Sequence, residues 1–360
     1  MNKFPEGNAL VYCEGAFNTT NGKTAHGLVR FTRRYNVTGV IDSRYAGKDA
    51  GEVLDGITKN MPIFENMDSA LKVAGQDKSN GLYFVVGLAP DGGRLSESAR
   101  DDVKKAIAAG MNIDCGLHDY LSEDDEISAL ANKHNVNIRD IRKPLTVDQL
   151  HFFSGKIEQV TSLKIALLGT DSAVGKRTTA RIITESLNQA GIATEMIGTG
   201  QTSWMQGARY NVVFDSLIND FVSGEIEHAV WSAWHDNKPQ VIMIEGQGSL
   251  MNPAYPGGFE ILAAGRPDII ILQHAPARKE YDGFPGYLIH PLAKQLQVAE
   301  MLSGKPVVAI AVNHENIERE NIKSVCEAVT MTTGLPAFDV LTQGSDGVIG
   351  VIKSYLKKAK

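Results

Sequence analysis

Cysteine and long apolar runs are both scarce in this chain of 360 residues. Its three cysteines, Cys13, Cys115 and Cys326, are too few and too far apart for a disulfide framework or a zinc site. No apolar run approaches the ~18 residues that a membrane-spanning helix needs. The opening MNKFPEGNALVY also lacks the basic-then-apolar order of a signal peptide. We therefore expect a cytoplasmic protein with no membrane partner and no cysteine-bound metal.

A surplus of positive charge is also missing. The formal net charge is -6, with acids and bases mixed along the chain, which argues against a nucleic-acid partner. The sequence contains no Gly-x-Ser-x-Gly elbow, and no Gly-x-Gly-x-x-Gly follows its first predicted strand. Dinucleotide binding by the first half is therefore not supported. Small anionic molecules that bind at local clusters remain as the expected ligands.

Two α/β domains are expected, because 360 residues exceed what one hydrophobic core usually organises. In the first half, β-branched runs predict strands, and capping residues predict helices. The predicted strands are 37–42, 82–89 and 111–117; a short strand leads into a helix within 61–75; and helices run from Ser96 to Ala109 and from a Ser122 cap to His134. These elements alternate, as in a sheet of buried parallel strands.

The second half shows the same alternation more strongly. Its predicted strands are 163–169, 193–198, 240–246, 268–275, 306–313 and 336–340, and its predicted helices are 176–189, 220–237, 291–302, 316–331 and 347–360. Six strands alternating with helices predict a doubly wound parallel sheet, whose ligands bind at the carboxyl ends of the strands. The domains are predicted to span 1–150 and 151–360. Adjacent Phe152 and Phe153 favour an ordered connection over a flexible linker.

One strand–helix junction, GTDSAVGKRTT at 169–179, has the features of a phosphate-binding loop. Backbone N–H groups and a helix N-terminus converge on an anion in such a loop, and a lysine adds a point charge. The usual loop has four residues between its glycine and Gly-Lys, and this one has five. The predicted binding residues are Gly169, Thr170, Asp171, Ser172, Ala173, Val174, Gly175, Lys176, Arg177 and Thr178. A loop that only packs the junction is the alternative interpretation.

Arg177 stands where a Mg²⁺-binding hydroxyl normally follows the lysine. One residue is ~100° of rotation on a helix, so Thr178 is not expected to replace that hydroxyl. Phosphate binding therefore remains expected, while metal-assisted chemistry on a γ-phosphate is in doubt and Mg²⁺ binding stays open. Glu245 ends an adjacent strand and is placed to hold Mg²⁺ or a proton, or only to fix loop amides.

The loop resembles the longer Gly-Thr-Asp…Val-Gly-Lys form of dethiobiotin synthetase-like P-loop proteins. In that branch a segment similar to IMIEGQGSL (242–250) helps to hold the metal. Over nearly its whole length the chain resembles a two-domain family with a Rossmann-like N-terminal half and a P-loop NTPase-like C-terminal half. The segments that carry this resemblance include IDSRYAGKDAGEVLDG (41–56), GTDSAVGKRTTA (169–180), IEGQGSLMNPAYPG (244–257) and LQHAPARKEYDGFP (272–285).

Members of that family are assigned as D-glutamate N-acetyltransferases. The resemblance implies acetyl-CoA as co-substrate, D-glutamate as substrate and a racemase-like partner enzyme in D-amino acid catabolism. P-loop relatives often pair subunits around the site, so a homo-oligomer is expected. Coenzyme A carries a pyrophosphate and a 3′-phosphate, which a phosphate loop without its Mg²⁺ hydroxyl suits.

Acetyl transfer to an amine needs a base, oxyanion donors and cations for the substrate carboxylates. Glu245 is the leading candidate base, Asp171 is an alternative that bonding to loop amides would equally explain, and His274 is a candidate relay. The candidate substrate ligands are the arginines Arg44, Arg94 and Arg278, the polar run Gln201, Thr202 and Ser203, and Tyr255 as a lid or pocket wall. Solvated surface side chains are the alternative interpretation of the arginines.

Two other functions compete with acetyl transfer. One is an ATP- and Mg²⁺-dependent ligase or kinase acting on a small carboxylate, in which Thr178 or Asp171 would complete the metal shell. The other is a nucleotide-sensing regulator, which binds without turnover.

Overall fold

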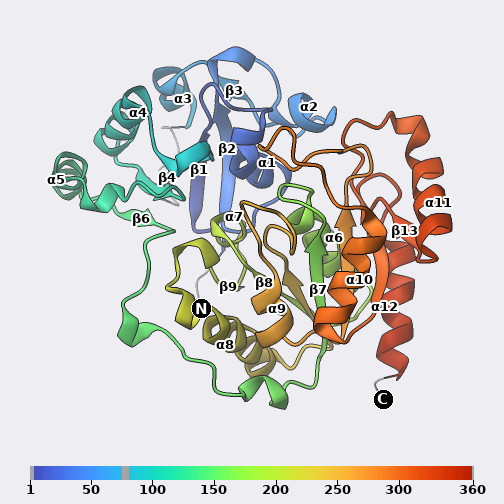
Figure 1. Ribbon diagram of the computed structural model, residues 1–360. Coiled ribbons are helices and arrows are strands. Elements are labelled where there is room, and N and C mark those ends of the chain that lie inside the picture. Colours follow the sequence, from blue (N-terminus) through green and yellow to red (C-terminus); the bar gives the residue numbers. More distant parts are fainter. Residues whose placement is uncertain (1–3, 75–80, 359–360) are drawn as a thin grey trace. The chain divides into compact units, whose positions relative to one another are not determined.

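The computed structural model describes residues 4–74 and 81–358 and divides into two compact units (Figure 1). Unit 1 comprises Met1–Pro144 and Gly200–Ala208, and unit 2 comprises Leu145–Thr199 and Arg209–Lys360. The main division therefore falls at Pro144, and a short segment from the second half of the sequence belongs to the first unit. No helix of the described ranges is long and apolar enough to cross a bilayer.

Unit 1 is built on six parallel strands in the order β3-β2-β1-β4-β5-β6, the order of a Rossmann sheet. The strands are β1 (Gly7–Tyr12), β2 (Tyr35–Ile41), β3 (Ile63–Phe64), β4 (Leu82–Val86), β5 (Asn112–Cys115) and β6 (Ile138–Asp140). The sequence analysis did not anticipate β1 and β6. The Rossmann-like fold class is confirmed.

Helices cover both faces of this sheet. One face packs on α3 (Met67–Ala74), α4 (Glu97–Ala108) and α5 (Asp125–His134), and the other on α1 (Lys23–Arg30), α2 (Ala50–Asp55) and α7 (Gln201–Met205). The expected Ser122 cap is wrong, because residues Leu121–Glu123 form a 3-10 turn and the side chain of Asp124 caps α5 through Ile127 N. Position 75 of the expected 61–75 element lies outside the described residues.

The short helix α7 comes from the second half of the sequence and is held in unit 1 by a buried arginine, a partly exposed arginine and the side chain of Gln206. Arg34, 3% exposed, lies 3.6 Å from the ring centroid of Trp204 and donates to the Trp204 carbonyl at 2.8 Å. Arg139 lies 5.0 Å from the same ring. Gln206 donates to the carbonyl of Gly27 at 2.8 Å. Stacking on Trp combined with direct hydrogen bonds holds such cations firmly, so this helix is an integral part of the unit.

Unit 2 contains seven parallel strands in the order β13-β12-β11-β7-β10-β8-β9. They are β7 (Leu163–Gly169), β8 (Thr194–Gly198), β9 (Tyr210–Asn211), β10 (Val241–Glu245), β11 (Ile269–His274), β12 (Val307–Val312) and β13 (Ala337–Phe338). The six predicted strands are present, and β9 is the additional one. The predicted doubly wound parallel sheet is confirmed.

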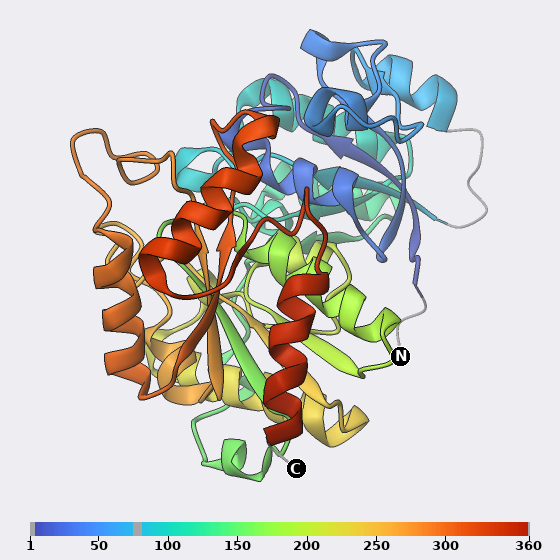
Figure 2. The same cartoon turned by 90° about the vertical axis from the view of Figure 1, so that its right-hand side faces the viewer.

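Alternate side chains along these strands enter two cores. One core packs on α6 (Lys176–Gln189) and α12 (Asp346–Lys358), and the other on α8 (Asn219–Asn237), α9 (Phe259–Ala264), α10 (Leu292–Ser303) and α11 (Ile322–Thr333). Figure 2 shows α12 as the red helix in front of the strands of this sheet. The helix expected at 316–331 starts later, at Ile322, because Arg319–Asn321 form a 3-10 turn. Residues 359–360 of the expected last helix lie outside the described residues.

The connection after Pro144 is ordered, because a carboxylate of α8 holds it. Glu227 is 2% exposed and accepts hydrogen bonds from Ser154 N at 2.6 Å, Ser154 Oγ at 2.9 Å and Ile157 N at 3.1 Å. Burial alone would raise the pKa of Glu227, but these donors lower it below its ordinary value. Gly224 allows the close approach, since a Cβ there would lie 2.0 Å from the carbonyl oxygen of His151.

Replacing this carboxylate should loosen the connection. Glu227→Gln keeps the size but turns an NH₂ group toward N–H donors, so the free energy of unfolding should fall by about 1–3 kcal/mol. Urea unfolding at pH 7 measures it, and Glu327→Gln on the exposed face of α11 is the control. The loss should shrink as the pH falls below the ordinary pKa of 4.5, where the unfolded carboxyl is protonated. Equal stability of the two variants at pH 7 would contradict this role.

Candidate functional site

The phosphate loop leaves the carboxyl end of β7, between the neighbouring strands β10 and β11, and enters α6. Two of its residues are left-handed, Ala173 with φ 52° and Gly175 with φ 95°. A Cβ at Gly175 would lie 3.3 Å from the side-chain nitrogen Nδ2 of Asn313. Asn313 also donates to the carbonyl of Val174 at 2.8 Å. The left-handed backbone of the loop is therefore stabilised by a side chain at the end of β12, as in preorganised ligand sites.

Lys176 begins α6 and is 7% exposed. Its Nζ donates to two carbonyl oxygens, of Asp171 at 2.7 Å and of Gly248 at 2.6 Å. An ammonium has three donors, so one remains for a ligand oxygen. Burial lowers the pKa of Lys176 to about 8, although Asp171 and Glu245 oppose the shift. The protein thus holds a poorly solvated positive charge at the start of a helix, where an anion is favoured.

Asp171 is fully buried, and both its carboxylate oxygens have two donors. Oδ1 accepts from Ser172 N at 2.7 Å and Asn252 Nδ2 at 2.8 Å. Oδ2 accepts from Arg278 Nη1 and Asp282 N, both at 2.8 Å. Four donors therefore occupy both oxygens of this carboxylate. The geometry therefore favours the interpretation that Asp171 organises loops over the interpretation that it takes part in proton transfer.

Glu245 ends β10 and is 6% exposed. Its Oε2 accepts from Thr199 N at 3.2 Å, and the Thr199 hydroxyl donates to the Glu245 carbonyl at 3.1 Å. The side chain of Gln247 in turn bonds Thr199 Oγ1 at 2.9 Å. Glu245 and Lys176 interact electrostatically. A buried carboxylate beside an anion-binding lysine is suited to receiving a proton from a bound ligand.

His274 ends β11, on the other side of β7 from Glu245. Its Nδ1 lies 3.1 Å from the hydroxyl of Thr170. Burial lowers the pKa of His274 to about 4, so the ring is neutral at pH 7. A neutral imidazole can orient Thr170 and the loop, and it carries no charge to attract a phosphate.

Arg278 is drawn into the loop and away from solvent. It bonds Asp171 and the Ser172 carbonyl through Nη1 at 2.8 Å, and Glu315 through Nη2 at 2.5 Å. Burial alone would lower the pKa of Arg278, but its bonds to the two carboxylates raise it. Its side chain is only 12% exposed, and these bonds show that the guanidinium is occupied by groups of the protein itself. This arrangement favours a positioning role over a carboxylate clamp.

The first turn of α6 contains Arg177, the residue that stands where a Mg²⁺-binding hydroxyl normally follows the lysine. Thr179 is 4% exposed and its N–H bonds the Gly175 carbonyl at 3.0 Å, as in a regular helix. Arg177 and Thr178 are half-buried. The loop residues Gly169 to Thr178 are contiguous around one helix N-terminus, as expected for an anion site.

Several predicted substrate residues lie in unit 1, whereas the phosphate loop belongs to unit 2. Arg44 follows β2, and its guanidinium bonds both oxygens of Asp42, at 3.0 and 2.7 Å, and the Phe17 carbonyl at 2.7 Å. The bonds to Asp42 raise the pKa of Arg44. Arg94 is exposed. Three further residues, Gln201, Thr202 and Ser203, are buried in α7. The Thr202 hydroxyl lies 3.0 Å from that of Thr24.

The sequence analysis missed the polar residues that brace the loop. Asn252, Asn313 and Glu315 contact Asp171, Val174 and Arg278, respectively. Asn313 directly follows an apolar strand, the signal that singled out Glu245 and His274, and the same rule would have found it. Asn252 follows no strand, so its role depends on tertiary structure alone.

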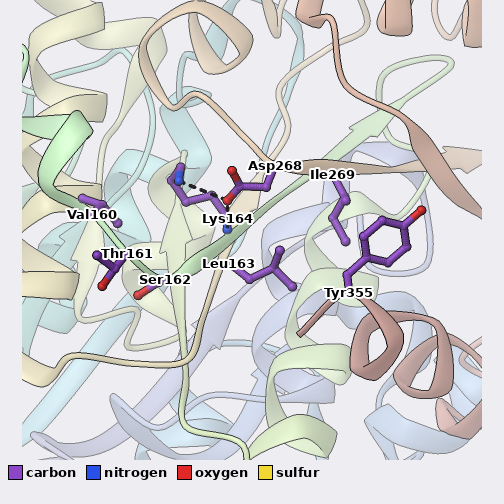
Figure 3. Close-up of a pocket in the computed structure, with 8 residues that line it drawn as sticks. All are labelled: Val160, Thr161, Ser162, Leu163, Lys164, Asp268, Ile269 and Tyr355. Atoms are coloured by element: carbon purple, nitrogen blue, oxygen red, sulfur yellow. Dashed lines mark hydrogen bonds and ion pairs between the residues drawn. The ribbon is translucent and has the colours of Figure 1, made fainter. Parts of the chain in front are cut away.

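One pocket of unit 2 lies at the opposite edge of the sheet from this site. The pocket of Figure 3 lies at the amino ends of β7 and β11, where the ion pair between Lys164 and Asp268 measures 3.0 Å. Ligands of parallel sheets bind at the opposite, carboxyl edge. Among residues 4–74 and 81–358, no three His, Cys, Asp or Glu side chains group as metal ligands.

Fold and site together define a class of two-unit α/β protein, in which a Rossmann-like sheet is combined with a strand–loop–helix phosphate site of P-loop type. Family models agree with this. One, described as a P-loop domain of unknown function (DUF1611, C-terminal part), matches residues 151–349. Another, described as a Rossmann-like domain of unknown function (DUF1611, N-terminal part), matches residues 43–144.

Relatives give the class a name. A protein from Pseudoalteromonas sp. named D-glutamate N-acetyltransferase is 33% identical over 282 residues, which cover 76% of this chain and 81% of the relative. One of the same name from Tritonibacter scottomollicae is 28% identical over 305 residues, covering 83% and 88%. A crystal structure of a DUF1611 family protein from Anabaena variabilis matches with a TM-score of 0.87 at 26% identity, covering 96% of this chain and 99% of that one. The chain belongs to this family, as predicted, and is an enzyme of the N-acetyltransferase class.

The buried charge of Lys176 has a measurable signature in stability. The folded-state pKa of Lys176, about 8, is below the ordinary value of 10.5. The unfolded chain therefore binds the proton more tightly, and this residue makes stability rise with pH between those values. Lys176→Met removes that rise. Between pH 7 and pH 10 the free energy of unfolding of the wild type should therefore rise by roughly 2–3 kcal/mol relative to that of the variant. Urea unfolding without ligand measures the difference, and a constant difference across this range would contradict the buried ammonium.

Proposed function

We propose that the protein transfers the acetyl group of acetyl-CoA to the amino group of D-glutamate, and that its phosphate loop holds the phosphates of the CoA moiety. The names of the two relatives support the reaction and the amino acid. The loop itself carries the assignment of the donor. Lys176 keeps an N–H for an anion, whereas Arg177 occupies the place of the Mg²⁺ hydroxyl. Such a loop suits a pyrophosphate that is bound and not cleaved.

The chain's own residues supply the elements of the transfer. Glu245 takes the proton that the ammonium group must lose before its nitrogen attacks the thioester carbon. A C–N bond then forms as the C–S bond breaks. One further proton passes from nitrogen to the leaving sulfur, so that N-acetylglutamate, CoA thiol and one free proton result. Lys176 and the loop amides anchor the donor throughout, which fixes the thioester relative to the base.

The remaining assignments are proposals on the same basis. Arg94, which is exposed, binds a substrate carboxylate. Arg44 assists through the part of its guanidinium that Asp42 and Phe17 leave accessible, since its side chain is 39% exposed, and the polar residues of α7 contribute to the same function. Arg278 acts through Asp171 and Glu315 and does not contact the substrate. The family resemblance further leads us to propose a cytoplasmic homo-oligomer that works beside a racemase-like enzyme.

Calorimetry separates this proposal from an ATP-dependent ligase. Purified protein should bind acetyl-CoA tightly and ATP with Mg²⁺ weakly, and thiol release should follow addition of D-glutamate more than L-glutamate. Tight binding of ATP with Mg²⁺ and ADP release would instead establish the ligase. Binding of a nucleotide without any turnover would establish a regulator.

The substituted helix position gives a sharper test. Arg177→Thr restores a hydroxyl after Lys176 and removes a cation, so the Kd for CoA should rise by about tenfold, the loss of one charge-assisted contact. Affinity for ATP with Mg²⁺ should not fall. Arg181→Thr, one turn further along α6, is the matched control. Unchanged CoA affinity and unchanged acetyl transfer in Arg177→Thr would show that this account of the position is wrong.

Donor binding should depend on pH through the lysine. Lys176 is protonated below its pKa of about 8 in the free protein, and only the ammonium form donates to a phosphate as a cation. The affinity for CoA should therefore be constant from pH 6 to 7 and fall by about tenfold per pH unit above 8. Lys176→Arg stays charged throughout this range, and its binding, although weaker, should lose this dependence. A flat profile for the wild type would exclude Lys176 as the phosphate ligand.

A further inference from the structure

An exposed aromatic cluster stands beside the phosphate loop. It consists of Tyr255, Phe284 and Tyr287, with the centroids of neighbouring rings 6.4 Å apart in both contacts. Tyr255 is 60% exposed and Tyr287 is 59% exposed, and the adjacent Leu288 is 68% exposed. Exposed apolar side chains gathered in this way commonly mark a binding surface.

The cluster is held in place by the loop that binds phosphate. Its rings come from the segments that follow β10 and β11, the two neighbours of β7. Asn252 bonds Asp171 through Nδ2 and accepts from Tyr255 N at 2.9 Å through Oδ1. On the other side, Asp282 N bonds Asp171 directly. One carboxylate of the phosphate loop therefore anchors both aromatic segments.

Backbone packing makes the first segment rigid. A Cβ at Gly248 would lie 2.0 Å from the Tyr255 carbonyl oxygen, so the backbone segments around these two residues are in contact. The Gly248 carbonyl also receives the Lys176 ammonium. The ammonium of Lys176 and the backbone of Tyr255 thus both contact Gly248.

We propose that these rings bind the thioester-bearing pantetheine arm of the acyl donor, an inference that rests on the proposed function. The segments 250–258 and 281–289 contain no lysine or arginine, so they offer no clamp for a dicarboxylate. Neighbouring rings are inclined at 65° and 81°, so neither neighbouring pair offers parallel faces that could sandwich a nucleobase. A corrugated surface with tyrosine hydroxyls suits a flexible chain of methylenes and amides.

Two ligands distinguish this site from the phosphate site. Acetyl-CoA contains the arm, whereas adenosine 3′,5′-bisphosphate has the nucleotide half alone. Tyr255→Ala and Tyr287→Ala should each raise the Kd for acetyl-CoA by about tenfold and leave that for the bisphosphate unchanged. Tyr255→Phe and Tyr287→Phe should keep most of the affinity. Phe152→Ala, at another exposed ring (70% exposed), is the matched control, and thermal unfolding verifies that all variants fold.

Each other outcome is informative. Equal weakening of both ligands would assign the rings to the nucleotide and overturn the proposal. A raised KM for D-glutamate with an unchanged Kd for acetyl-CoA would assign them to the amino acid. Unchanged constants throughout, with transfer intact, would leave the surface to a macromolecular partner and overturn this inference alone. Failure of the wild type to bind acetyl-CoA would instead overturn the proposed function, and with it this site.

Discussion

The buried carboxylate of Asp171 is the group on which the second unit's site depends. Four donors converge on it from Ser172, Asn252, Arg278 and Asp282. A buried charge is costly unless it is paired and fully hydrogen-bonded. Satisfying it therefore requires the segments after β10 and β11 to close onto the loop after β7. The loop conformation, the place of Arg278 and the aromatic segments follow from this one requirement.

The same region also holds an unfavourable charge. Lys176 is buried with a lowered pKa, and its ammonium contacts two neutral carbonyl oxygens and no carboxylate directly. Under the proposed function, a phosphate bound there would meet a charge that water screens little. The hydrogen bonds of Asp171 fix the loop. The desolvated charge of Lys176 lowers the stability of the fold and is suited to an anionic ligand. The site combines a saturated anion with an unsaturated cation, which is the arrangement that an anion-binding site needs.

Much of the second unit could be predicted from sequence because its signals are local. Apolar runs bounded by turn residues predicted six of its seven described strands, and the predicted helix 176–189 coincides with α6. Glu245 and His274 were found because strand ends in a parallel sheet meet at one edge. The four-donor role of Asp171 was only one of two open interpretations, since its partners lie up to 111 residues away in the chain. Arg278 carries the same lesson: a position after a strand predicts that a side chain reaches the site, but not which groups there occupy it.

The membership of α7 in unit 1 shows most clearly where sequence order stops being informative. Its neighbours Thr199 and Arg209 belong to unit 2, yet Trp204 lies against Arg34 and Arg139 in the first unit. Nothing in the run GQTSWMQGA indicates this, because a tryptophan that stacks on arginines has the same sequence as one buried in any core. The consequence is physical: the chain crosses between the units three times, after Pro144, Thr199 and Ala208. Thr199 is also the residue whose N–H reaches Glu245. The crossing that begins α7 is therefore joined by a hydrogen bond to the carboxylate proposed as the base, so ordering of one constrains the other.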